Sequence, residues 1–180
     1  MRVIAGDKRR MVLYSPRNDR IRPTGDKIKE TLFNMIGYKV EGAVFWDLFS
    51  GTGQIGIEAL SRGAAFCEFF DTERDALALI EENLKHTKLY ENGRIIRGSL
   101  PMTISKGREV PDIIFMDPPY DKGFYLPVFK ELASMELSED VLIIAESDLK
   151  EDFSFLEELG FTAQKEKLYK SSKHVFIGKR

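Results

Sequence analysis

The sequence predicts an α/β protein in which a mainly parallel sheet is covered by helices on both faces. After residue 42, short apolar runs alternate with segments of helical periodicity. The apolar runs contain few polar residues, as in strands that are buried on both faces of a parallel sheet. The chain ends in two alternating segments, 161–169 and 173–179, joined by a short polar turn. These segments predict a final β-hairpin, and therefore an antiparallel last strand.

An N-terminal extension, residues 1–41, precedes this alternation. Residues 2–5 and 11–14 predict two short strands of a hairpin with a basic turn between them. After a loop, Thr24 is expected to cap a helix over 26–36, which Gly37 ends. The later strands are expected over 44–49, 66–70, 94–97, 112–116 and 141–145, and the later helices over 54–62, 73–87, 122–136 and 151–159. We interpret the chain as one domain, residues 1–180, whose core spans residues 42–180.

Composition excludes several classes of protein. The 180 residues are 43% hydrophobic and 31% charged, which describes a soluble globular domain rather than a disordered or coiled-coil chain. No apolar run reaches the length of about 18 residues that a membrane span needs. A lone cysteine, Cys67, provides no disulfide framework and favours a cytoplasmic protein. The two histidines, His86 and His174, are far apart in the sequence, so we expect no metal site.

The charge is distributed unevenly. Residues 1–30 carry a net charge of +5 and residues 165–180 also carry +5, whereas the segment between them carries −12. Basic ends on an acidic body favour a polyanionic partner at one edge of the molecule. The candidate phosphate contacts are the basic residues of the N-terminal arm, Lys8, Arg9, Arg10, Arg17, Arg20 and Arg22.

A glycine-rich turn follows the first expected strand. Gly51, Gly53 and Gly56 fit the pattern G-x-G-x-x-G between a strand and a helix, which serves several nucleotide cofactors. Asp47 lies just upstream, where a carboxylate would repel a pyrophosphate and attract a cationic group. Asp71 ends the second strand, where its carboxylate can accept hydrogen bonds from ribose hydroxyls. S-adenosylmethionine is cationic at one end and a nucleoside at the other, so it fits both acids.

The turn after the fourth expected strand reads Asp117-Pro118-Pro119-Tyr120. Two prolines fix the backbone and remove two N–H donors, so the turn offers mainly hydrogen-bond acceptors. Such a site suits a planar NH₂ group, which Asp117 and the Pro118 carbonyl would orient, while Tyr120 supplies a ring for base stacking. The turn therefore predicts methyl transfer to an amine, with catalysis arising mainly from positioning.

These motifs together resemble a known family. Asp-Pro-Pro-Tyr, combined with residues 47–53, resembles the amino-methyltransferases that use S-adenosylmethionine. The segments 2–6 (RVIAG), 22–24 (RPT), 29–34 (KETLFN) and 56–64 (GIEALSRGA), together with Arg10, resemble the bacterial 16S ribosomal RNA guanine-N2 methyltransferases, the RsmD-like family. The resemblance spans nearly the whole chain. Three places depart from the family pattern. Asp71 stands where Glu is usual, Ser99 stands where Asp is common, and Ser171-Ser172 replaces a glycine-containing turn in the final hairpin.

The resemblance implies a seven-stranded class I methyltransferase sheet and methyl transfer to N2 of one guanine in small-subunit rRNA, leaving S-adenosylhomocysteine. The RNA partner would be the small ribosomal subunit or an assembly intermediate, and the protein a monomer. Asp117, Pro118, Pro119 and Tyr120 would hold the target amine. The candidate cofactor-binding residues, of which Ser99 and Leu100 are chosen by position after the third strand, are Asp47, Phe49, Ser50, Gly51, Gly53, Asp71, Ser99 and Leu100.

Other functions stay open from the residues alone. A DNA adenine-N6 methyltransferase also uses an Asp-Pro-Pro-Tyr turn, but 180 residues leave no room for a separate target-recognition domain. A methyltransferase acting on a protein or a small amine fits the basic arm less well. A nicotinamide-dependent oxidoreductase matches the glycine pattern but not Asp47 or the proline turn. A non-catalytic RNA-binding module would not need the intact Asp-Pro-Pro-Tyr turn.

Overall fold

The computed structural model of the protein describes residues 1–16 and 24–180. Its centre is a seven-stranded sheet with the order β3-β2-β1-β4-β5-β7-β6. The strands are β1 (Val44–Leu48), β2 (Phe66–Asp71), β3 (Gly93–Arg97), β4 (Ile113–Met116), β5 (Leu142–Asp148), β6 (Phe161–Leu168) and β7 (Ser172–Lys179). Strands β1 to β5 are parallel, and β7 runs antiparallel to both β5 and β6. The predicted fold class is therefore confirmed, including the antiparallel last strand.

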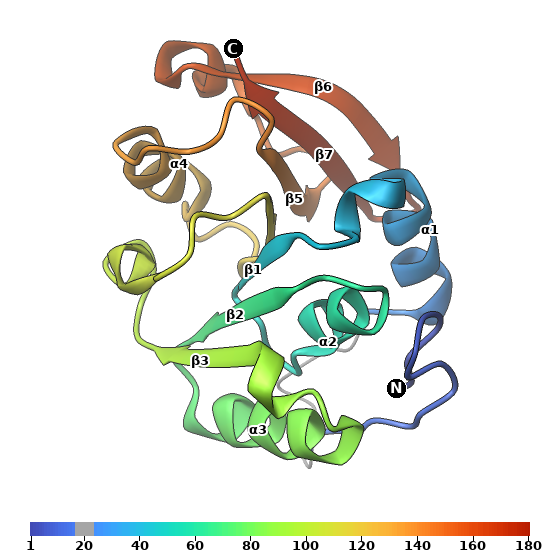
Figure 1. The fold of residues 1–180 in the computed structure, drawn as a ribbon. Helices are drawn as coiled ribbons and strands as arrows, with labels where there is room; N and C mark the ends of the chain where they lie inside the picture. The colour runs from blue at the N-terminus through green and yellow to red at the C-terminus, as the bar shows by residue number, and fades with distance from the viewer. Residues whose placement is uncertain (17–23) are drawn as a thin grey trace.

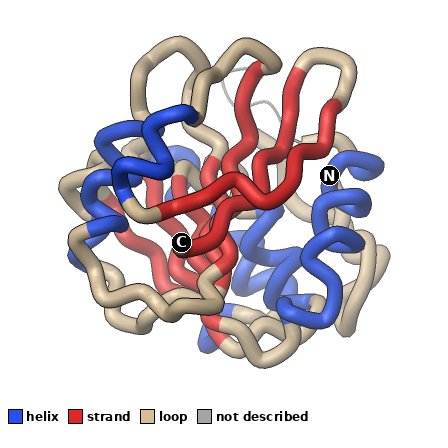
Figure 2. Tube along the Cα trace, turned by 90° about the horizontal axis from the view of Figure 1, so that it is seen from above, coloured by secondary structure: helices blue, strands red, loops and turns tan. Residues whose placement is uncertain are grey.

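Helices cover both faces of the sheet (Figures 1 and 2). One face packs against α1 (Asp26–Ile36), α2 (Gln54–Ser61) and α3 (Arg74–Thr87), which contribute Leu32, Ile57 and Ile80 to its core. The other face packs against α4 (Tyr125–Ala133) and two 3-10 helices, Ile104–Lys106 and Ser154–Leu159. Since both faces are covered, the central strands are buried along nearly their whole length. No helix among the described residues is long and apolar enough to cross a membrane.

The N-terminal hairpin forms, but it is shorter than expected. Its two arms are joined by backbone hydrogen bonds that include Val3 N–H to the Met11 carbonyl (2.9 Å), and only one isolated bridge, between Arg2 and Val12, is formed. The predicted strands 2–5 and 11–14 are therefore wrong in extent. The reason is a distant acceptor, because the N–H groups of Ile4 and Ala5 donate to the Glu58 carboxylate on α2 rather than to the opposite arm.

Three helix predictions also need correction. Helix α1 has the expected bounds and ends at Gly37, whose φ is 63°, but its N-cap is Gly25 and no side chain caps it, so the predicted Thr24 cap is wrong. Helix α4 covers nine residues, less than the expected 122–136. The expected helix over 151–159 is a 3-10 helix of six residues that ends before Gly160, whose φ is 80°. A segment this short gains more from packing Phe155 and Leu156 against the core than from helix propagation.

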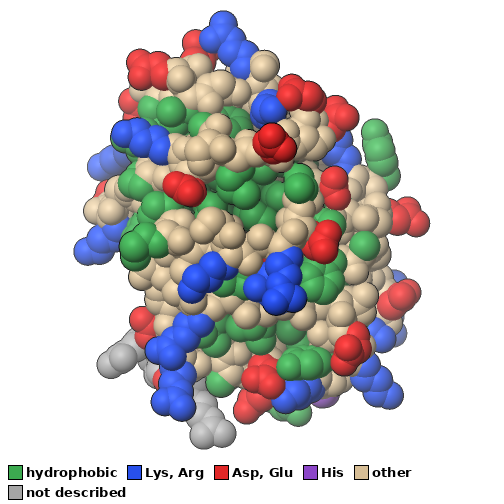
Figure 3. Space-filling model, turned by 60° about the vertical axis from the view of Figure 1, so that its left-hand side comes forward, with side chains coloured by type: hydrophobic (Ala, Val, Ile, Leu, Met, Phe, Trp, Pro, Cys, Tyr) green, Lys and Arg blue, Asp and Glu red, His purple; other side chains and the backbone are tan. Residues whose placement is uncertain are grey.

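The surface carries both signs of charge. Figure 3 shows one face on which Lys and Arg side chains are interspersed with Asp and Glu around a central group of hydrophobic side chains. On the sheet edge, β6 is exposed and carries Lys165 and Lys167, which disfavour pairing with a further strand. Positive charge is therefore not gathered into one patch on the face that Figure 3 shows.

Candidate active site

A cavity of about 930 Å³ opens at the carboxyl edge of the parallel strands, where open α/β sheets bind their ligands. Asp47 on β1, Asp71 at the end of β2 and Asp117 just after β4 all line it. The structure therefore brings together the glycine turn and the proline turn, which are more than 60 residues apart in the sequence. Of the candidate residues, those that line the cavity are Asp47, Phe49, Ser50, Gly51, Asp71, Ser99, Leu100, Asp117, Pro118, Pro119 and Tyr120.

The glycine turn has an unusual backbone. Phe49, Gly51 and Gly53 have φ values of 61°, 54° and 74°, so three of five consecutive residues lie in the left-handed region. Glycine adopts that region freely, whereas at Phe49 it costs of the order of 1 kcal/mol or more. Hydrogen bonds hold the turn, from Ser50 N–H to the Phe70 carbonyl (2.9 Å) and from Gly53 N–H to the Ser50 carbonyl (2.8 Å). Strained backbone of this kind is common where a loop is shaped around a ligand.

Asp47 is a buried carboxylate with one backbone donor. Asp47 is only 1% exposed, and its Oδ2 accepts a hydrogen bond from Gly56 N–H at 3.0 Å. Burial raises the pKa of Asp47 well above its ordinary value, and the neighbouring Asp71 and Asp117 raise the pKa further. A cationic ligand group beside Asp47 would relieve both effects.

Asp71 anchors two turns and keeps acceptor capacity. Its Oδ2 accepts from Gly51 N–H at 2.8 Å, and its Oδ1 accepts from Glu73 N–H at 2.9 Å. Each carboxylate oxygen has two lone-pair sites, so about half of its capacity is left for a ligand. Asp71 therefore both stabilises the glycine turn and faces the cavity as a hydrogen-bond acceptor.

The Asp117 carboxyl is half-buried at the cavity. Burial raises its pKa to about 8, and the nearby Glu146 carboxylate contributes to the rise. Pro118 is buried and Pro119 is exposed, while Tyr120 is partly exposed and lines the same cavity. The proline turn thus presents a carboxyl group, carbonyl groups and an aromatic ring to the cavity, without N–H donors at its two prolines.

The described residues that line the cavity make it acidic. Five carboxylates line it, and no Lys or Arg among residues 1–16 and 24–180 does so. A phosphate or pyrophosphate would be repelled by this lining, whereas a sulfonium or an ammonium group would be attracted. In the described part of the chain, no group of three or more His, Cys, Asp or Glu side chains gathers to hold a metal ion. The five acids are Asp47, Asp71, Glu73, Asp117 and Glu146.

Some predicted residues lie elsewhere. Gly53 does not line the cavity, and it shapes the turn as the residue that precedes α2. Arg17, Arg20 and Arg22 lie outside the described residues. Residues 8–10 are tied to the C-terminal end of α2, because Lys8 N–H donates to Ser61 Oγ at 2.9 Å. Helix α2 begins at the cavity and is about 12 Å long. Residues 8–10 therefore lie near the amino ends of the parallel strands, opposite the cavity.

Sequence reasoning missed further residues that line the cavity. Glu146 on β5 is the most informative of them, because it stands one strand away from Asp117. The expected strand 141–145 stops one residue short of it, and an acid directly after an apolar run was the available signal. Others are Thr24, Gly25, Ile28, Gln54, Phe124, Ser171 and Ser172.

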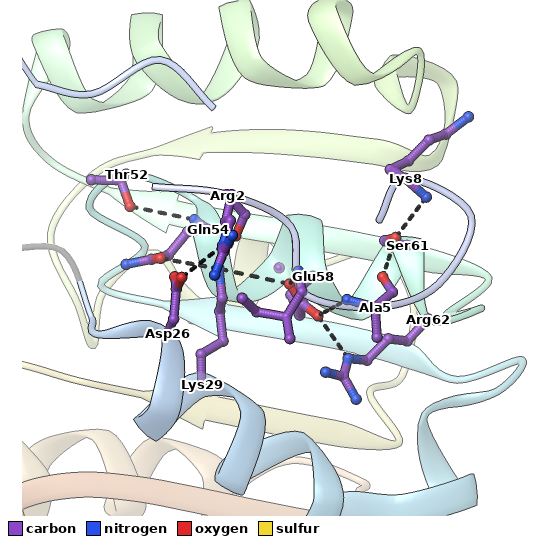
Figure 4. Close-up of polar contacts among 12 residues, drawn as sticks. Arg2, Ala5, Lys8, Asp26, Lys29, Thr52, Gln54, Glu58, Ser61 and Arg62 are labelled. Carbon is purple, nitrogen blue, oxygen red and sulfur yellow. Dashed lines mark hydrogen bonds and ion pairs between the residues drawn. The ribbon is translucent and has the colours of Figure 1, made fainter. Parts of the chain in front are cut away.

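A buried ionic cluster ties the N-terminal extension to the cavity wall (Figure 4). Lys29 on α1 is fully buried, and its Nζ donates to the Arg2 carbonyl at 2.6 Å and to Gln54 Oε1 at 3.3 Å. Glu58, also fully buried, lies 3.7 Å from Lys29 Nζ and accepts from Arg62 Nε at 2.8 Å. Since Gln54 lines the cavity, the hairpin and α1 support the start of α2 from behind.

Known proteins resemble this chain over most of its length. A family model described as "Conserved hypothetical protein 95" matches residues 1–177. "Putative rRNA methyltransferase YlbH" of Bacillus subtilis is 37% identical over 152 residues, covering 82% of this chain and 83% of that protein. "Ribosomal RNA small subunit methyltransferase D" of Escherichia coli K12 is 30% identical over 151 residues, covering 83% and 76%. A solved structure described as "Putative methyltransferase yhhF from Escherichia coli" superposes with a TM-score of 0.88 at 27% identity, covering 100% and 98%.

Proposed function

Since the chain belongs to the conserved hypothetical protein 95 family, the RsmD-like family that its motifs resemble, we propose that it is an rRNA methyltransferase that uses S-adenosylmethionine and modifies the exocyclic N2 amine of a guanine in 16S rRNA. One observation carries the proposal. A single acidic cavity is lined both by the glycine turn and by the Asp117-Pro118-Pro119-Tyr120 turn. A cationic methyl donor and a planar amine can therefore meet in the same cavity. We treat residues 1–180 as one catalytic domain.

The proline turn would hold the amine. The Asp117 carboxylate and the Pro118 carbonyl accept its two N–H groups, and Tyr120 stacks on the base. With both hydrogens bonded in the plane of the base, the nitrogen lone pair is directed out of that plane, toward the methyl donor. A strong general base is unnecessary, because the proton leaves after the nitrogen has become cationic. Reaching Tyr120 requires the guanine to leave its stack, as bases do in other enzymes that modify them.

The acids at the other side of the cavity would hold the methyl donor. S-adenosylmethionine supplies a methyl group on a positively charged sulfur. Asp47 would attract its ammonium end, and Asp71 would accept hydrogen bonds from the ribose hydroxyls. Ser99 and Leu100 would border the adenine, with Leu100 buried and Ser99 exposed at the cavity. The residues thus fit a ligand that is cationic at one end and a nucleoside at the other, and Asp47→Asn should weaken its binding in calorimetry.

The proposed partner is 16S rRNA within a small subunit or an assembly intermediate, bound by a monomeric cytoplasmic enzyme. The basic residues at positions 8–10 stay predicted RNA contacts. Because they lie at the far edge of the sheet from the cavity, they would bind RNA that extends beyond the target base.

The test is methyl transfer from labelled S-adenosylmethionine to small ribosomal subunits that lack the modification, followed by digestion to nucleosides. We expect label in N2-methylguanosine, and its loss in Asp117→Ala. Label in another nucleoside would contradict the guanine assignment. Absence of label in every nucleoside, with intact cofactor binding, would contradict the proposed activity.

A further inference from the structure

Three neighbouring strands place Asp117, Glu146 and His174 side by side. Met116 on β4 is opposite Ala145 on β5, so Asp117 and Glu146 are at the next position along both strands. Glu146 is directly opposite His174 on β7. All three side chains lie on the face of the sheet that α1 covers, because the residue two positions away on each strand belongs to the core of that face. These three residues therefore form a row that runs from Asp117, at the cavity, to His174, in the buried interior.

Glu146 is held firmly. It is 8% exposed, and its Oε2 lies 2.9 Å from His174 Nε2. His174 is fully buried, and its Nδ1 lies 3.1 Å from the Tyr169 hydroxyl. The backbone carbonyl of Glu146 also accepts from the Tyr125 hydroxyl at 2.6 Å. With Glu146 ionised, His174 donates through Nε2 and accepts from Tyr169 through Nδ1, which fixes one carboxylate oxygen.

The other oxygen is available to a ligand. Glu146 lines the cavity, and its Oε1 makes no hydrogen bond to any of the residues that the structure describes. Asp117 lies close enough for the charge of Glu146 to act on it. Two acceptor groups, fixed by adjacent strands, thus face the same part of the cavity.

Of the four bases, guanine is the one that fits two adjacent hydrogen-bond acceptors. In guanine the exocyclic amine is next to the ring N1–H, so these two adjacent groups are both donors. In adenine and cytosine the exocyclic amine is next to a ring nitrogen that bears a lone pair. We infer that Glu146 accepts the N1–H of guanine while Asp117 holds the amine, so that Glu146 makes the site select guanine. This inference rests on the proposed function and names the residue that determines its specificity.

The chemistry explains why adenine would be rejected. An adenine with its amine on Asp117 would turn the N1 lone pair toward the Glu146 carboxylate. The N1 lone pair would then face Glu146 Oε1 in a partly buried site, and neither of these two atoms would have a hydrogen bond. His174 and Tyr169 prevent the carboxylate from turning away. Glu146 is thus a specificity residue, and His174 and Tyr169 are positioning residues.

The test compares two bases that carry the same 2-amino group. Once the modified guanine is mapped, small subunits are reconstituted with rRNA that carries guanine or 2,6-diaminopurine at that position. Diaminopurine keeps the 2-amino group but has a lone pair at N1. We expect the unaltered enzyme to prefer guanine in kcat/KM by about tenfold or more, the effect of one well-placed hydrogen bond to a base edge. Glu146→Leu should lower kcat/KM for guanine more than for diaminopurine and largely remove the preference.

The control is Glu166→Gln on β6, which is separated from β5 by β7; Glu166 does not line the cavity, so this variant should keep the preference. Thermal unfolding and cofactor binding are measured for each variant, so that a folding defect is recognised. Equal kcat/KM for the two bases in the unaltered enzyme overturns the inference and leaves the proposed function standing. An unchanged ratio in Glu146→Leu, with both rates lowered together, also overturns it, because it points to Glu146 as a proton acceptor or a purely structural residue. Failure to methylate guanine at all contradicts the proposed function itself.

Discussion

Removal of the Glu58 carboxylate should be among the most damaging single changes outside the cavity. Glu58 is fully buried and accepts four interactions, since Ile4 N–H (2.8 Å), Ala5 N–H (3.0 Å) and Arg62 Nε (2.8 Å) donate to it and Lys29 Nζ lies 3.7 Å away. In Glu58→Ala the ammonium of Lys29 would be left buried without its counter-charge. Burial already lowers the pKa of Lys29, because it disfavours the charged form of the side chain.

The magnitude follows from these contacts. Breaking a buried ion pair by removing one partner costs about 3–5 kcal/mol. The two backbone N–H groups add to this, but Ile4 and Ala5 are only partly buried, so water can reach them and their contribution is small. We therefore expect Glu58→Ala to lower the free energy of unfolding by about 3–5 kcal/mol. A domain of this size has about 5–15 kcal/mol in total, so the variant should fold but unfold at much lower urea.

The assay is equilibrium unfolding in urea, together with hydrogen exchange of the N-terminal hairpin. Because Glu58 anchors the hairpin, the amides of Ile4 and Ala5 should exchange much faster in Glu58→Ala. The single variants Lys29→Met and Glu58→Gln are compared with the double variant Lys29→Met/Glu58→Gln. The double variant should lose less stability than the two single variants together, because no uncompensated ammonium is left.

The matched control is Glu81→Ala, which removes the same kind of side chain from an exposed ion pair with Lys85. Exposed pairs contribute little, so this variant should unfold almost as the unaltered protein does. A loss in Glu58→Ala no larger than that in Glu81→Ala would refute the reasoning. Additive losses in the double variant would refute the role given to the ion pair.

Four further predictions concern other parts of the molecule. The pKa of Asp117 is raised to about 8, and its ionised form is the hydrogen-bond acceptor. The kcat/KM for methyl transfer should therefore rise with pH and level off above about pH 8. A flat profile from about pH 6 to 9 would contradict this prediction. Because the pKa of Asp117 is raised, the folded protein holds a proton that the unfolded chain releases between about pH 4 and pH 8. The free energy of unfolding should therefore fall with rising pH over this range, and Asp117→Asn should remove that fall. Gly56→Ala should destabilise the protein by about 1–3 kcal/mol in urea unfolding, because its Cβ would lie 2.3 Å from Phe69 Cε1, whereas Gly25→Ala, with nothing within 4 Å, serves as the control. Reversal of the basic residues at positions 8–10 to Glu should weaken RNA binding and reduce its salt dependence without changing cofactor affinity, and unchanged RNA binding would remove them as contacts.

The alternation of apolar runs and helical segments predicted the sheet well, for a physical reason. Strands that are buried on both faces must be apolar throughout, and this pattern is local. Helix α1 was predicted with the bounds Asp26–Ile36 because its apolar spacing and Gly37 are also local signals. The N-terminal hairpin was predicted less well, since its first arm bonds to Glu58, more than 50 residues away in the sequence. No local pattern contains that information.

The cavity was predicted from acids and glycines at strand ends, and the same rule explains what was missed. Asp47, Asp71 and Asp117 each stand at or just after the end of an apolar strand, and the carboxyl ends of parallel strands share one edge of the sheet. Glu146 obeys this rule as well. It escaped because β5 continues to Asp148, where its pairing with the antiparallel β7 extends it beyond its apolar part.

The buried partners of Glu146 show where the limit lies. His174 has no cluster of ligands near it in the sequence, and its position on an alternating strand predicts only that it faces inward or outward. Its role depends on a pairing between β5 and β7 that is antiparallel and joins residues 28 positions apart. A buried histidine must find a hydrogen-bond partner, and in this sheet the partner is an acid that also lines the cavity. The need to satisfy a buried polar group is therefore what connects the last hairpin to the candidate active site, and it can be recognised only when the strand order is known.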